Sequence, residues 1–140
     1  MLCFLVVACG ESSPPVFSVD YAASFVEVRN CRSSADHDLN KIRILADPDA
    51  LPIYTTRDAP FPVAAVVLKE EYDFADDACS GSIKQWTVMR KRDDATNGGW
   101  TWQRVDADRA VVSEDATRCI NCHAQCGRPP EGHDGTCAVP

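Results

Sequence analysis

The chain has 140 residues, a formal net charge of −7 and 45% hydrophobic residues. This length suits one globular domain with a modest core. A net negative charge opposes binding to nucleic acids and to anionic membranes, so we expect neither as a partner. The eight cysteines are many for a chain of this size, and they indicate an oxidising compartment, a metal site or a covalently bound cofactor.

The first nine residues are apolar and uncharged, but they are too short to span a bilayer, which needs about 20 residues. Residues 6–9, Val-Val-Ala-Cys, resemble a bacterial lipoprotein box in which Cys9 becomes the lipidated first residue. An ordinary cleaved signal peptide and a core strand are the alternatives. We therefore expect a signal segment over residues 1–9, a flexible tether over 10–17 and one folded domain over 18–140. Such a protein would be exported to the periplasm, with a lipid anchor at Cys9.

The spacing of apolar, glycine and proline residues predicts the secondary structure in chain order. The expected elements are a short amphipathic helix over 19–30, a strand over 41–46, a helical turn or two from Asp47 to Tyr54, strands over 63–72, 83–90 and 100–105 with a turn at 97–99, and a short helix from about Ser113 that carries Cys119. Residues 127–140 are rich in glycine and proline and are expected to be irregular. This order predicts an α+β domain, a mainly antiparallel β-sheet packed with a few short helices.

Residues 119–123, Cys-Ile-Asn-Cys-His, form the C-x-x-C-H pattern of haem c attachment. Two thiols three residues apart on one helical turn can add to the two vinyl groups of a haem. The adjacent histidine then lies beneath the iron as its ligand. The motif therefore predicts one covalently attached haem c, held by Cys119 and Cys122, with His123 on the iron.

Other interpretations of this motif stay open. A redox-active cysteine pair is one, although such pairs accompany a βαβ pattern that this sequence lacks. Half of a zinc site, completed by Cys126, His133 and Cys137, is another, and structural disulfides are a third. If the motif holds haem, the remaining cysteines allow disulfides Cys31–Cys79 and Cys126–Cys137, each contributing roughly 2–4 kcal/mol of stability.

From about Ile42 to Cys126 the chain resembles the cytochrome P460 family, which includes the cytochromes c′-beta. The resemblance rests on the Asp47-Pro48 helix start, residues 61–70, the strand at Trp86, the Gly99-Trp100 turn and the haem motif near the C-terminus. It implies a mainly antiparallel sheet around one haem, an iron with an open distal face and, often, a homodimer. The tail from Cys126 to Cys137 extends beyond the family pattern.

The resemblance also singles out one lysine. In the hydroxylamine-oxidising members a lysine side chain is cross-linked to the haem edge, and the matching position is Lys69. The c′-beta members lack this bond and are associated with nitric oxide. Lys69 shares a strand face with Val67 and Ala65, so it could meet the porphyrin. A solvated lysine beside Glu70 is the alternative.

Further side chains are candidates for the surroundings of the haem. Phe61 is the candidate for an apolar wall over the iron, and Met89 is either a sixth ligand or ordinary core. The remaining candidates are His37 and His133 as sixth ligands, Arg90 and Arg104 for the propionates, and Trp86, Trp100 and Trp102 for the pocket or the core.

Three functions are compatible with these observations. The first is a redox enzyme that oxidises hydroxylamine or a related nitrogen species and passes electrons to a partner cytochrome. The second is a non-catalytic protein that binds nitric oxide. The third is a periplasmic electron carrier with a filled sixth site, and the coordination of the iron separates it from the other two.

Overall fold

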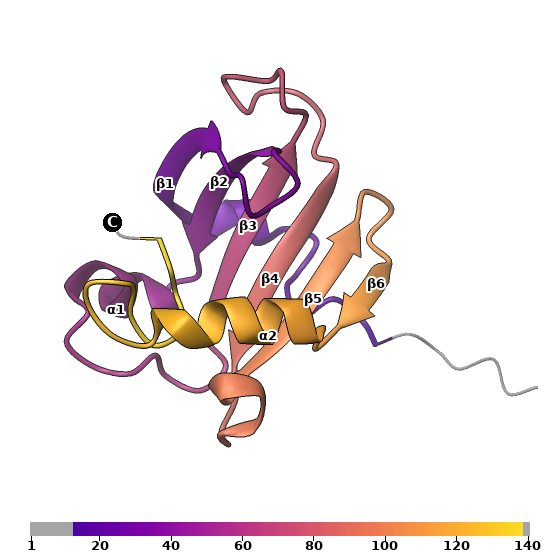
Figure 1. Cartoon of the computed structure of the whole chain (residues 1–140). Helices are drawn as coiled ribbons and strands as arrows, with labels where there is room; N and C mark the ends of the chain where they lie inside the picture. Colours follow the sequence, from indigo (N-terminus) through magenta and orange to yellow (C-terminus); the bar gives the residue numbers. More distant parts are fainter. Residues whose placement is uncertain (1–12, 139–140) are drawn as a thin grey trace, which may run out of the picture.

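Six β-strands form a single antiparallel sheet in a computed structural model of the chain, which describes residues 13–138 (Figure 1). The strands lie side by side in chain order: β1 (Val26–Ser33), β2 (Lys41–Ala46), β3 (Val66–Tyr72), β4 (Gln85–Lys91), β5 (Trp100–Asp106) and β6 (Val111–Glu114). The helices are α1 (Ala50–Thr56) and α2 (Thr117–His123), with 3-10 turns η1 (Tyr21–Ala23), η2 (Thr96–Gly99) and η3 (Ala124–Cys126). The predicted α+β class, a mainly antiparallel sheet with a few short helices, is confirmed.

The helix predicted over residues 19–30 is wrong. Only the turn η1 forms, and its carbonyl at Tyr21 accepts a 2.9 Å hydrogen bond from the Phe25 amide. One turn is enough to place the rings of Tyr21 and Phe25, four residues apart, on the same side of the chain. From Val26 onward the β-branched valines favour an extended strand, which pairs with β2 from Val26 opposite Ala46.

The last predicted helix begins later than expected. Ser113 lies in β6 opposite Arg104, and α2 starts at Thr117. The residues before Ser113 are two valines, which favour a strand. Their hairpin is closed by the Asp106 carboxylate, which accepts a 2.9 Å hydrogen bond from the Ala110 amide.

The N-terminal signal segment and the first residues of the predicted tether lie outside the described residues. Within the tether, Phe17 is only 6% exposed, and the Val16 amide donates to the Gln103 side chain at 2.9 Å. The packed domain therefore reaches further toward the N-terminus than residue 18. None of the helices within residues 13–138 is long and apolar enough to cross a membrane.

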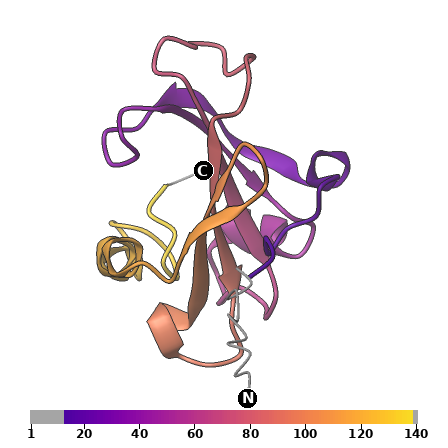
Figure 2. The same cartoon turned by 90° about the vertical axis from the view of Figure 1, so that its right-hand side faces the viewer.

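The two faces of the sheet are covered by opposite ends of the chain. Figure 2 shows α2 and the C-terminal tail on one side and the N-terminal segment on the other. Strand alternation assigns the side chains of β3 to these faces. We call the face toward α2 the cavity face, with Val67, Lys69 and Glu71, and the opposite one the back face, with Val66, Leu68 and Glu70.

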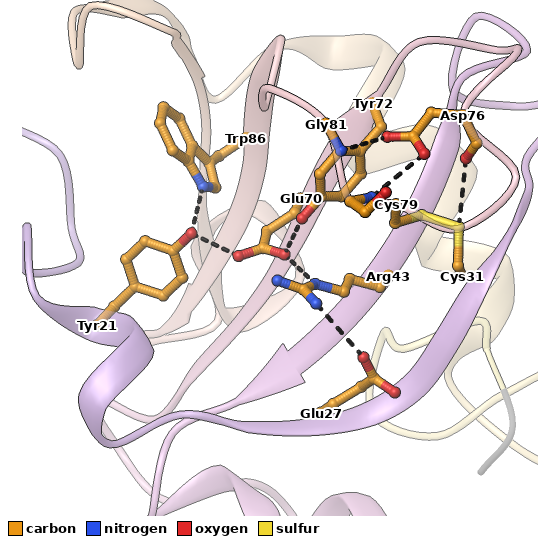
Figure 3. A network of polar contacts seen from close by, with 11 residues as sticks. Tyr21, Glu27, Cys31, Arg43, Glu70, Tyr72, Asp76, Cys79, Gly81 and Trp86 are labelled. Carbon is orange, nitrogen blue, oxygen red and sulfur yellow. Dashed lines mark hydrogen bonds and ion pairs between the residues drawn. A yellow bond between two sulfur atoms is a disulfide. The ribbon is translucent and has the colours of Figure 1, made fainter.

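A buried carboxylate anchors the N-terminal segment on the back face (Figure 3). Glu70 accepts hydrogen bonds from the hydroxyls of Tyr21 at 2.5 Å and Tyr72 at 2.6 Å, and it pairs with the Arg43 guanidinium. The Trp86 indole N–H donates to the Tyr21 oxygen at 3.0 Å. Burial alone would raise the pKa of Glu70, but these donors outweigh it and lower the pKa. The charge is thus fully partnered, and Tyr21 is fixed against the sheet.

Both predicted disulfides are present. Cys31–Cys79 joins β1 to the connection between β3 and β4, and Cys126–Cys137 closes a loop in the C-terminal tail. Within residues 13–138 this leaves two free thiols, Cys119 and Cys122.

Candidate functional site

A cavity of about 320 Å³ separates α2 from the sheet, and Cys119, Cys122 and His123 all line it. A smaller cavity of about 50 Å³ also borders Cys119 and His123. The connection between β1 and β2 bends to the same side of the sheet as α2 (Figure 2). His37 in this connection lines both cavities. The sequence motif therefore borders the space between α2 and the sheet, with Cys119 half-buried and Cys122 exposed at its edge.

The register of the sheet builds the floor of these cavities from two cross-strand rows. Residues of one row are directly paired across β3, β4, β5 and β6: Lys69, Thr87, Arg104 and Ser113. The other row is apolar and is paired across β3, β4 and β5: Val67, Met89 and Trp102. The floor thus has a polar side and an apolar side, which suits a large flat ligand with an apolar body and charged substituents.

The position of α2 is fixed by Asp115, two residues before the helix begins. The Asp115 amide donates to the Trp102 carbonyl at 2.7 Å, and the Asp115 carboxylate accepts from the Trp102 amide at 2.9 Å. Cys119 and Cys122 are three residues apart and so lie on one side of the helix. Ile120 packs against the core of the cavity face.

His123 makes its hydrogen bond within residues 13–138 through only one of its two ring nitrogens. Its Nδ1 lies 2.6 Å from the Gly135 carbonyl oxygen, which can only accept, so Nδ1 carries the proton. The ring also lies 4.6 Å from the Trp102 ring, centroid to centroid. Burial, together with the positive charge of Lys69, lowers the pKa of His123 to about 4. The imidazole is therefore neutral at neutral pH, and Nε2 has a lone pair available for a metal.

Lys69 lies on the floor of the smaller cavity, beside Cys119 and His123. Its Nζ is 2.8 Å from Nε2 of His37. Burial lowers the pKa of Lys69 to about 8, although the negative charge of Glu71 opposes the shift. A fraction of this amine is therefore neutral, and nucleophilic, near physiological pH.

Glu71 stands behind this pair, and it was not among the residues singled out from the sequence. Its Oε1 lies 3.2 Å from Nδ1 of His37 and accepts from the Thr87 hydroxyl at 2.9 Å. Its Oε2 accepts from Asn40 at 2.9 Å and from Gln85 at 2.7 Å. Burial by itself would raise the pKa of Glu71, but the hydrogen bonds outweigh it and lower the pKa to about 2. Glu71, His37 and Lys69 thus form a linear polar chain that ends in the cavity.

His37, a sixth-ligand candidate from the sequence, has a side chain that is only 19% exposed because its loop folds over Glu71. The alternation of β3 would have placed Glu71 on the same face as Lys69, so that signal was present in the sequence. No local signal indicated His37, because 34 residues separate it from Glu71.

Several other candidates lie away from the cavities. Phe61 lines neither one; it is 3% exposed and packs edge-on against Trp100 at 5.3 Å between ring centroids. His133 donates from Nε2 to the Ala59 carbonyl at 2.8 Å, so that nitrogen is occupied. Trp86 belongs to the core of the back face.

Met89, Trp102 and Arg104 do line the cavities. Arg90 is exposed and lines neither one, so of the two predicted propionate partners the structure brings only Arg104 to the site. Arg118, at the start of α2, also lines the larger cavity, and the sequence interpretation missed it.

The residues that would complete a zinc site with the motif are not available as ligands. Cys126 and Cys137 are bonded to each other. No group of three or more histidine, cysteine, aspartate or glutamate side chains in residues 13–138 could hold a metal ion. The residues present instead fit a haem c: two free thiols on one helical turn, a neutral imidazole whose Nε2 can bind a metal, a cavity floor that is apolar on one side, and arginines beside it.

An antiparallel sheet that carries a C-x-x-C-H helix across one face defines a cytochrome of β-sheet architecture, unlike the helical small cytochromes c. The chain belongs to the cytochrome P460 family, because residues 20–128, well over half of it, match the model of that family, Cytochrome P460. No curated protein matches the chain. The resemblance stated from the sequence is confirmed, and membership of the family implies a haem cytochrome.

The lowered pKa of Glu71 predicts how the stability of the fold depends on pH. Its pKa is about 2 in the folded chain against an ordinary value of 4.5. Its contribution to the free energy of unfolding is therefore fully present above pH 4.5 and is lost as the pH falls toward 2. Glu71→Gln is expected to lower stability at pH 7 by about 3 kcal/mol, with a smaller difference at pH 3, as measured by urea unfolding. Glu131→Gln, at an exposed position, is the control, and a Glu71 variant as stable as the parent at pH 7 would contradict this role.

Proposed function

We propose that this protein carries one haem c, covalently attached through Cys119 and Cys122, and that it binds and oxidises a small nitrogen species at an open haem face. Hydroxylamine is the substrate we favour. The observation that carries this proposal is the Lys69 amine, which borders the same cavity as Cys119 and His123 and lies 2.8 Å from His37. When bound, the haem supplies an iron centre for the nitrogen ligand and a path for electrons.

The residues of α2 hold the cofactor in this proposal. Cys119 and Cys122 provide the two thioether sulfurs, and His123 provides Nε2 to the iron. Arg104 and Arg118 can pair with propionates, because a guanidinium matches a carboxylate in shape and charge. The covalent bonds keep the cofactor in place even though the larger cavity is open along one side.

Lys69 is the residue that we propose to form a covalent cross-link with the haem. A bond from its Nζ to a ring carbon replaces one N–H and one C–H bond, so two electrons and two protons must leave. A peroxide is the class of oxidant that can take both electrons and become water. His37 is placed to accept the proton of the amine, and Glu71 stabilises the resulting imidazolium.

His37 and Glu71 can also remove protons during catalytic turnover. Oxidation of hydroxylamine releases protons together with electrons, and a base within hydrogen-bond reach of the substrate is needed to take the protons. His37 lines both cavities and has Glu71 behind it, so it is the distal base that we propose. A small redox cytochrome would take the electrons.

Export to the periplasm is part of this proposal. Two disulfides are typical of an oxidising compartment, and haem c attachment occurs on exported chains. The proposed lipid anchor at Cys9 lies outside the described residues, and the same holds for the whole predicted signal segment.

One observation favours an alternative. Met89 lines the smaller cavity, so its sulfur is a candidate sixth ligand, and a filled sixth site would make the protein an electron carrier. The experiment is to express the full chain in a cytochrome-maturing host, record the ferrous spectrum and assay hydroxylamine with an artificial electron acceptor. We expect a high-spin spectrum and turnover. A six-coordinate low-spin spectrum without turnover would support the electron carrier, and nitric oxide binding without turnover would support a gas-binding protein.

A further inference from the structure

The C-terminal tail, residues 126–138, folds back against the side of α2 that carries His123. The Cys126–Cys137 disulfide closes it into a loop. Most of this segment follows residue 128, where the match to the family ends. The tail is therefore a feature of this chain that the family assignment does not account for.

Hydrogen bonds from four separate parts of the fold hold the tail. The Asp134 carboxylate accepts hydrogen bonds from Lys91 on β4, at 2.8 Å, and from the Phe61 amide, at 2.9 Å. The Trp100 indole N–H on β5 donates to the Asp134 carbonyl at 2.8 Å. On α1, the Tyr54 hydroxyl donates to the carbonyl of Ala138 at 3.2 Å. These hydrogen bonds therefore fix the position of the tail in addition to the disulfide.

Two glycines allow the backbone to follow this path. Gly135 has φ of +88°, and a Cβ there would lie 3.0 Å from the Trp100 indole nitrogen. A Cβ on Gly132 would lie 2.4 Å from the Thr136 carbonyl oxygen and 2.6 Å from that of Cys126. A side chain at Gly135 would crowd Trp100, and one at Gly132 would collide with the backbone of the tail's own loop.

This packing holds the Gly135 carbonyl in place as a hydrogen-bond acceptor for His123. The Gly135 carbonyl lies 2.6 Å from Nδ1 of His123, and the Cys137 sulfur lies 3.7 Å from the same nitrogen. A hydrogen bond from Nδ1–H to a carbonyl fixes the ring orientation and makes Nε2 a stronger donor to a metal. A stronger donor stabilises the ferric over the ferrous state.

We propose that the tail is a strap whose Gly135 carbonyl orients His123 and lowers the reduction potential of the haem. The inference rests on the proposed function, because it needs a haem on His123. Gly135 and the residues that hold it are positioning elements in this scheme, since none of them contacts the reacting ligand.

The test compares the two disulfides. Cys126→Ser with Cys137→Ser releases the strap, and Cys31→Ser with Cys79→Ser is the matched control, at a disulfide that lines neither cavity. Asp134→Asn is the second strap variant, because it keeps the disulfide and weakens the bonds to Lys91 and Phe61. Each protein is exported in a cytochrome-maturing host, and two quantities are measured: the midpoint potential and the iron–histidine stretching frequency in the ferrous resonance Raman spectrum.

Both strap variants are expected to shift the ferric–ferrous equilibrium about tenfold toward the ferrous state, a rise of about 59 mV, and to lower the stretching frequency. The control should keep both values. If either strap variant binds haem and keeps both parental values, the strap has no such role. Absence of haem from the parent protein would overturn the proposed function itself, so the two failures are distinguishable.

Discussion

Replacing Cys119 and Cys122 together by alanine is expected to abolish covalent haem attachment completely. These are the two free thiols in residues 13–138, and they line one cavity together with His123. Without the two thioethers no haem would be fixed beside Lys69 for the proposed cross-link. Only non-covalent contacts would then remain: the histidine, the arginines beside the cavity and the apolar residues of its floor. The denatured double variant should therefore have the mass of the polypeptide alone, while the parent carries one haem.

The control for this experiment is the pair Cys31→Ala and Cys79→Ala. It removes the same number of sulfurs but leaves α2 unchanged, so the haem mass should remain. Stability should fall by roughly 2–4 kcal/mol, the typical effect of losing a disulfide. A Cys119/Cys122 double variant that still carried covalent haem would show that attachment occurs elsewhere in the chain.

Lys69→Met is expected to prevent the proposed haem cross-link and to lower the proposed hydroxylamine oxidation on the order of 100-fold. Methionine has a similar length but no amine, so the partner of His37 in the cavity is lost. A cross-link distorts the porphyrin and moves the ferrous Soret band far to the red. The variant should therefore show the band of an ordinary high-spin haem c, and peptide mapping should no longer find a haem joined to both β3 and α2.

The control variant is Lys41→Met. Lys41 lies on β2, pairs with Asp77 at 2.5 Å and lines neither cavity, so its loss should leave the spectrum unchanged. Because the pKa of Lys69 is lowered to about 8 by burial, the yield of cross-linked parent should rise between pH 7 and pH 9. Identical spectra for the parent and Lys69→Met would show that no cross-link forms.

Two adjacent glutamates on β3 have different roles because they lie on opposite faces of the sheet. Glu70 points to the back face and binds Tyr21 and Arg43, which fix the N-terminal segment (Figure 3). Glu71 points to the cavity face and holds His37. Both are almost fully buried, and both are stabilised as carboxylates by several donors. Their different roles follow from the alternation of side chains along one strand.

The strands could be predicted wherever the apolar pattern was local and regular. β2 begins and ends at the predicted residues, and β3, β4 and β5 differ from prediction by three residues at most. The error at residues 19–30 arose because two aromatic rings at helical spacing need only one turn. The boundary of a short turn depends on what packs against it, here the back face of the sheet, and not on its own sequence.

The candidate site was predictable to the extent that it is local. The spacing of the two cysteines and the histidine indicated one helical turn, and strand alternation indicated that Lys69 could face inward. The partners of these residues could not be predicted. His37 reaches Lys69 through a folded loop, and Gly135 reaches His123 through a tail held by four other parts of the chain. Such contacts are decided by tertiary packing.

The most direct test of the central claim is mass spectrometry of the full chain after export in a cytochrome-maturing host. The intact denatured protein should have the mass of the mature polypeptide plus one haem. Proteolysis should then locate that haem on the peptide containing Cys119 and Cys122. A polypeptide without added haem mass, in which both of these thiols react with an alkylating reagent, would contradict the account.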